Sequence, residues 1–116
     1  MIYPELRNIV SQDLEPPALP PDVNDCAVPF HALIGPRGAE AAEAFAFLVV
    51  TPMALRRLPE PQWGRGYLIV PVFEWGPVTM AIAQLLVQCA RPTWDEVLLE
   101  LDRELRWQPD YPRVES

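Results

Sequence analysis

Two runs of alternating side chains, residues 26–34 and 45–51, flank a connection that contains Gly35 and Gly38. Alternation with a period of two is the pattern of a strand with one buried face. Two such runs joined by a polar, glycine-containing connection predict a β-hairpin, with segment 35–43 as its turn. The residues expected to share one face of their strand are Val28, Phe30, Ala32 and Ile34 in the first run, and Phe45, Phe47, Val49 and Thr51 in the second. Any fold for this chain has to contain this pair of strands.

The segment that precedes the hairpin is divided by prolines. Residues 6–10 predict a short first strand, whereas residues 14–25 contain four prolines. Because proline fixes φ and cannot donate a backbone hydrogen bond, 14–25 is expected to be an extended, exposed linker. Pro29 lies inside the first hairpin strand, so we expect it where the ladder needs no donor.

Helices dominate the second half of the chain. Residues 51–58 predict a short helix, and residues 67–73 an apolar strand in which Pro71 marks an edge or a bulge. Residues 75–90 predict a long helix that contains no charged side chain. A second long helix begins at Thr93, whose side chain can cap it.

The order of these elements predicts the fold class. Strands come first and helices last, which favours an α+β fold with helices on one face of an antiparallel sheet. We expect about four strands, a short helix between strands 3 and 4, and two C-terminal helices packed on one face. A chain of 116 residues has the length of one domain with a modest core, so residues 1–116 are expected to form a single domain.

Charge and composition limit the partners of this chain. It has 16 acidic and 9 basic residues, and a formal net charge of −7. A nucleic-acid-binding domain needs clustered positive charge, so nucleic acid is excluded as a partner, whereas the field of this chain would steer a basic protein toward it. No apolar run reaches the roughly 20 residues of a membrane span, and the N-terminus lacks the pattern of a signal peptide. We expect a cytoplasmic protein with no membrane association.

No group of residues forms a recognisable catalytic, metal or cofactor site. A phosphate-binding loop would need a helix after Gly35 and Gly38, but the residues that follow alternate as a strand, so we predict a turn. His31 has no nucleophile motif beside it, and Cys26 and Cys89 lack the spacing of a zinc site. We expect a structural or surface role for His31, and two reduced cysteines that pack as small apolar residues.

Two surface features point to a protein partner instead. The last helix carries a row of acids, in which Glu96, Glu100 and Glu104 lie four residues apart and repel one another. A basic partner would relieve this repulsion. The uncharged helix 75–90 should be buried on more than one side. Its second side is either covered by the sheet and the last helix, or is an interface with a partner or a second copy.

Four segments of the chain carry a family resemblance. They are PELRNIVSQDLE, HALIGPRGAEAAEAFAFLVVTPMAL, WGRGYLIVPVFEW and TWDEVLLELDRELRW, and together they span nearly the whole chain. In this order they resemble the bacterial Immunity protein 8 family of polymorphic toxin and contact-dependent inhibition systems. The resemblance implies a protein encoded beside a toxin, which binds the toxic domain in the producing cell as a stoichiometric inhibitor and not as an enzyme.

Under this interpretation the acids of the last helix steer and contact a basic toxin surface. The exposed loop WGRG supplies candidate anchors, because interface hot spots favour Trp and Arg, although Trp63 could instead pack over the sheet. The candidate partner-binding residues are Trp63, Arg65, Glu96, Glu100, Asp102 and Glu104. Two other functions stay open: an adaptor or chaperone for a secreted effector, and a homodimeric structural protein that uses helix 75–90 as its interface.

Overall fold

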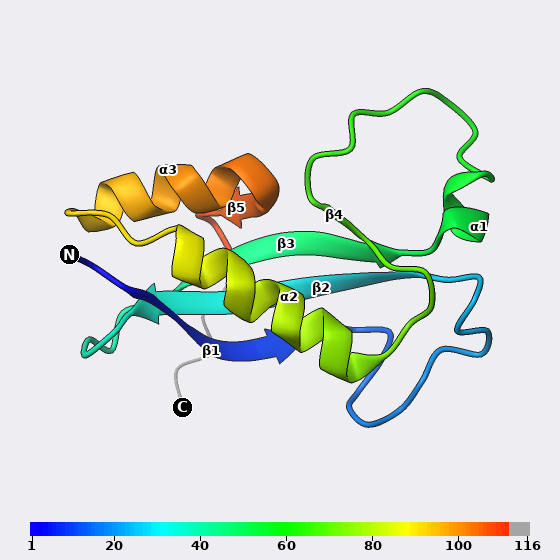
Figure 1. Ribbon diagram of the computed structural model, residues 1–116, viewed down its shortest axis with the longest axis horizontal. Coiled ribbons are helices and arrows are strands. Elements are labelled where there is room, and N and C mark those ends of the chain that lie inside the picture. Colours follow the sequence, from blue (N-terminus) through cyan, green and yellow to red (C-terminus); the bar gives the residue numbers. More distant parts are fainter. Residues whose placement is uncertain (112–116) are drawn as a thin grey trace.

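The computed structural model describes residues 1–111, which form one mixed sheet with two long helices on one of its faces (Figure 1). The strands are β1 (Pro4–Val10), β2 (Ala27–Pro36), β3 (Glu43–Val50), β4 (Tyr67–Ile69) and β5 (Arg106–Gln108). The helices are α1 (Pro52–Leu55), α2 (Trp75–Gln88) and α3 (Trp94–Glu104). The strand order is β1-β2-β3-β4, and β5 also pairs with β3. The predicted α+β class, with a short helix between β3 and β4 and two C-terminal helices, is confirmed.

The predicted hairpin is formed by β2 and β3. The two strands are antiparallel, with Phe30 opposite Phe47. The eight side chains predicted to share a face in each strand lie on the buried side of the sheet, and each is at most 4 % exposed. Pro29 lies just beyond the end of β1, where its carbonyl accepts a hydrogen bond from the Ser11 hydroxyl at 2.6 Å. On that side of β2 the ladder has already ended, so the missing donor of Pro29 costs nothing.

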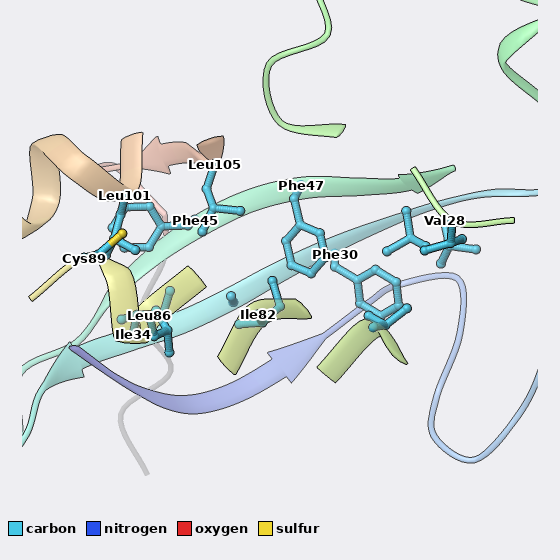
Figure 2. Packing of buried hydrophobic residues seen from close by; sticks show 14 of the residues in the cluster. Val28, Phe30, Ile34, Phe45, Phe47, Ile82, Leu86, Cys89, Leu101 and Leu105 are labelled. Atoms are coloured by element: carbon cyan, nitrogen blue, oxygen red, sulfur yellow. The ribbon is translucent and has the colours of Figure 1, made fainter. Parts of the chain in front are cut away.

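The core lies between this hairpin and the two long helices (Figure 2). The Phe30 ring stacks on Phe47, with ring centroids 5.4 Å apart, and meets Trp75 edge-on at 5.6 Å. At the start of α3, the Thr93 hydroxyl accepts a hydrogen bond from the Glu96 backbone at 3.3 Å, which confirms the predicted cap. The buried side chains that the helices add to this core are Val78, Ile82, Leu86, Val97, Leu98 and Leu101.

The sheet differs from the prediction because of the long connection that follows β3. After α1 the chain runs through residues 56–66, and this crossover brings β4 back parallel to β3. The sheet is therefore mixed and not purely antiparallel. The predicted strand 67–73 ends at Ile69, two residues before Pro71. The segment after α3, for which we predicted no strand, forms β5 against the first half of β3.

The glycines of the hairpin connection are needed for its turn. A Cβ atom on Gly35 would lie 2.1 Å from the Ala41 carbonyl oxygen, and Gly38 has a φ of 86°, which favours glycine. The Arg7 side chain donates to the carbonyl oxygens of Pro36 and Ala39. The connection thus turns backbone carbonyl oxygens toward the Arg7 guanidinium, whereas a phosphate site would turn backbone N–H groups toward an anion. The prediction of a turn is confirmed.

We expect Gly35→Ala to lower the free energy of unfolding by about 1–3 kcal/mol, because the backbone at Ala41 has to move. Gly64→Ala is the matched control, since no atom lies within 4 Å of a Cβ added there. It should change the free energy by less than about 0.5 kcal/mol. Urea titrations followed by circular dichroism measure both values, and equal stabilities would contradict this description of the turn.

Candidate partner-binding face

The six predicted partner residues, which we call the candidate face, lie on α3 and on the connection between α1 and β4. The structure brings the ends of these two segments together. A terminal nitrogen of Arg65 donates to the Asp102 carbonyl oxygen at 3.0 Å and lies 3.6 Å from the Asp102 carboxylate. The Gly66 backbone N–H donates to the carbonyl oxygen of Glu104 at 2.9 Å. Arg65, Asp102 and Glu104 therefore form one cluster at the end of α3, whereas Glu96 lies in the first turn of the helix.

Two arginine–aspartate pairs hold the connection that carries Trp63. Near its start, the two terminal nitrogens of Arg57 each lie 2.5 Å from a carboxylate oxygen of Asp25, which ties the connection to the proline-rich segment before β2. At its end, Arg65 is held on Asp102. Between these points the connection forms a wide arc that stands away from the sheet (Figure 1). The arc is therefore fastened at both ends.

Trp63 is 92 % exposed, so the alternative in which it packs over the sheet is wrong. Its neighbour Gln62 is fixed, because the Tyr67 hydroxyl donates to the Gln62 side-chain oxygen at 2.6 Å. A large apolar side chain left in water on a tethered segment is typical of an interaction site. Binding through Trp63 would cost little conformational entropy, since its segment is already held in place.

Two of the predicted acids are engaged inside the protein. The Glu100 carboxylate lies 3.1 Å from Arg91, which follows α2, and 3.6 Å from Arg103. The Asp102 carboxylate accepts a hydrogen bond from the Trp107 backbone at 3.0 Å, at the start of β5. These two carboxylates therefore hold α3 against its neighbours, a role that the repeating acidic pattern did not reveal.

The other two acids, Glu96 and Glu104, are exposed, and neither has an ion pair with any of the residues 1–111. Glu104 is the last residue of α3, where the helix dipole places partial negative charge. The Glu104 carboxylate is therefore unfavourably placed in the isolated protein, and a cation bound beside it would be stabilising.

A cavity of about 210 Å³ lies between α2, β4 and the end of α3. Its lining is mostly apolar and includes Leu68 of β4 together with Ile82 and Leu85 of α2. Gln88 and Glu104, both exposed, also belong to its lining. The sequence did not predict this cavity because its walls come from segments that are far apart along the chain.

The uncharged helix α2 is covered by the protein on one side only. Val78, Ile82 and Leu86 are buried against the core, whereas Met80 is 59 % and Val87 is 81 % exposed. The alternative in which the sheet and the last helix cover both sides is therefore wrong. The outer side of α2 is an uncharged surface that a partner or a second copy can reach.

The remaining chemical groups do not form a site. The His31 ring packs against Tyr111, with ring centroids 4.5 Å apart. Burial raises the pKa of the Cys89 thiol, with a further contribution from Glu100, and burial also raises the pKa of Cys26, so both remain protonated at neutral pH. Within residues 1–111 no three His, Cys, Asp or Glu side chains come together as metal ligands. In the same range, every helix is too short or too polar to cross a bilayer.

The Arg57 hydrogen bonds lower the pKa of the Asp25 carboxyl below its usual value of 3.8. The folded protein thus favours the charged form of Asp25. The stabilisation of the fold by the Asp25–Arg57 pair is therefore fully present above the usual pKa of 3.8, and it is lost as the pH falls through the lowered pKa. We expect the difference in urea midpoint between wild type and Asp25→Asn to shrink between about pH 5 and about pH 3. Glu40→Gln is the control, because Glu40 has no ion pair with any of the residues 1–111. A difference that stays constant over this range would contradict the pairing.

Comparison with known proteins identifies one family. The family model described as Immunity protein 8 matches residues 4–111, a range that contains all six residues of the candidate face. No curated protein and no solved structure matches the chain.

Proposed function

The chain belongs to the Immunity protein 8 family, and on this premise we propose that it binds the toxic domain of a cognate bacterial toxin one to one and so inhibits it. Membership of an immunity family implies toxin neutralisation by a protein that is typically a non-enzymatic inhibitor. The observation that carries the proposal is the extent of the match. Residues 4–111 include every helix and strand of the structure, from the start of β1 to the end of β5.

An inhibitor of this kind has to stay bound for longer than the toxin needs to act, so its dissociation must be slow. Protection also needs a dissociation constant well below micromolar, which corresponds to more than about 8 kcal/mol of binding free energy. The setting that we propose is a polymorphic toxin or contact-dependent inhibition system. There the two proteins meet in the cytoplasm of the producing cell.

The charges of the candidate face support a basic toxin surface as the partner. The chain has a net charge of −7, which accelerates the approach of a basic protein. Glu96 and Glu104 supply carboxylates that are not engaged within residues 1–111. Trp63 supplies a large apolar anchor close to the end of α3. An interface with an apolar anchor and a charged rim is the usual arrangement in stable complexes.

Coexpression with the toxic domain encoded next to this chain tests the proposal. Growth of a host that makes the toxin should be restored by this protein, and calorimetry with a catalytically inactive toxin should give tight one-to-one binding. Binding without restored growth would favour an adaptor or chaperone instead. The absence of both would overturn the proposal.

The exposed outer side of α2 supports a second candidate, a structural homodimer. Sedimentation of the protein alone at several concentrations separates the two functions. A concentration-dependent dimer that Val87→Glu converts to a monomer would support the homodimer. A monomer at all concentrations would remove it.

Truncation of the exposed indole should weaken toxin binding strongly. We expect Trp63→Ala to raise the dissociation constant about 30-fold, as for other hot-spot residues. Leu19→Ala is the control, because Leu19 is also exposed, at 56 %, but lies in the proline-rich segment. Calorimetry with inactive toxin measures both, and a change of less than about twofold for Trp63→Ala would remove this residue from the interface.

Reversal of the two unpaired charges should slow association. We expect Glu96→Lys combined with Glu104→Lys to lower the association rate constant about tenfold at low salt and to weaken its salt dependence. The pair Glu15→Lys and Glu40→Lys changes the net charge equally, away from α3 and from the connection that carries Trp63. Stopped-flow mixing at several salt concentrations gives the rate constants. If both double variants slow association equally, the acids of α3 have no specific role.

A further inference from the structure

The size of the cavity between α2, β4 and α3 limits what it can hold. Its volume of about 210 Å³ is below the roughly 300–1,000 Å³ of sites that bind small molecules. A volume of this order suits a single long side chain, and pockets that receive one anchor side chain are the usual centres of protein interfaces. The exposed residues Gln88 and Glu104 mark where the cavity opens to solvent.

The lining of the cavity selects the chemistry of this side chain. Leu68, Ile82 and Leu85 give the cavity an aliphatic wall, and the acidic residue Glu104 also belongs to its lining. A wholly apolar side chain would remove water from the carboxylate without replacing its hydrogen bonds, which is costly. An acidic side chain would be repelled. A side chain with an aliphatic stem and a cationic head satisfies both the wall and the carboxylate.

Within residues 1–111, no ion pair neutralises the charge of Glu104. The neighbouring arginines make other contacts: Arg91 pairs with Glu100 at 3.1 Å, and Arg106 donates to the backbone oxygen of Arg65 at 3.3 Å. Glu104 also lies at the negative end of α3, one turn after Glu100. A cation that enters the cavity therefore meets a carboxylate for which the described chain offers no counter-ion.

We propose that this cavity receives one arginine or lysine side chain of the toxin, with its stem against Ile82 and Leu85 and its head on Glu104. This inference rests on the proposed function and adds to it the group that the protein recognises. It separates two roles within the interface. Glu96, outside the cavity, acts on the rate of approach, the apolar wall of the cavity acts on the rate of release, and Glu104 contributes to both.

Two substitutions close the cavity or remove its charge, and each has a matched control. Ala81 lines the cavity, and Ala81→Leu fills it, whereas Ala83→Leu adds the same group to an exposed position of α2 outside the lining. Glu104→Gln removes the carboxylate, and Glu40→Gln removes one on the β2–β3 connection. With inactive toxin, we expect Ala81→Leu and Glu104→Gln each to raise the dissociation constant about tenfold or more, mainly through faster dissociation. The two control variants should change the dissociation constant by less than about twofold.

A double-mutant cycle identifies the partner side chain. Each arginine and lysine of the inactive toxin is replaced by alanine and tested against wild type and Glu104→Gln. One toxin variant should bind wild type and Glu104→Gln with equal affinity, because the alanine substitution in the toxin has already removed the contact with Glu104. If wild type binds the toxin tightly but both cavity variants bind equally well, or no toxin residue is coupled to Glu104, the inference is overturned and the proposed function stands. If wild type neither binds nor protects, the proposed function itself fails.

Discussion

The packing of Phe30 against three other aromatic rings is the interaction on which the rest of the structure depends. Its ring lies on Phe47 across the hairpin (Figure 2). The same ring stacks on Phe73 after β4 and meets Trp75 edge-on at the start of α2. One side chain thus joins the sheet, the segment that returns from the crossover and the first turn of the helix above them. Removal of a buried phenylalanine costs about 3–5 kcal/mol, a large part of the 5–15 kcal/mol by which a domain of this kind is stable.

The outer edge of β3 connects this core to the candidate face. Its second half pairs with β4, and its first half pairs with β5. Phe47 lies between the two paired stretches and lines the cavity below α2. Because β4 and β5 follow the arc and α3 respectively, the same edge brings the end of the arc to the end of α3. The position of Arg65 on Asp102 is therefore a consequence of how β3 shares its edge.

The sequence pattern within a segment was enough to predict those helices and strands that the segment's own residues determine. The alternation in 26–34 and 45–51 predicted the hairpin, the helical spacing of apolar residues in 75–90 predicted α2, and Thr93 predicted the start of α3. The parallel β4 and the short β5 were not predictable in this way. Both depend on the path of residues 56–66 and on the edge of β3, which only the folded chain defines.

The candidate site was predicted in outline but not in its internal contacts. The sequence placed acids on one helix and Trp63 in a loop, and the exposure of Trp63 agrees with that outline. It could not show that Glu100 and Asp102 are held by arginines from elsewhere in the chain, leaving Glu96 and Glu104 unpaired within the described residues. Nor could it show the cavity beside Glu104, since four separate segments form its walls. Contacts between distant residues carry no periodic signal in a single sequence.

The most direct measurement of the central claim is amide hydrogen exchange of this protein, alone and bound to the inactive toxic domain. If the toxin occupies the candidate face and the cavity, exchange should slow in segments 63–66, 81–88 and 96–104 and stay unchanged in β1 and in the proline-rich segment 14–25. Protection confined to β1 and 14–25, in a complex that still silences the toxin, would contradict the interface described above.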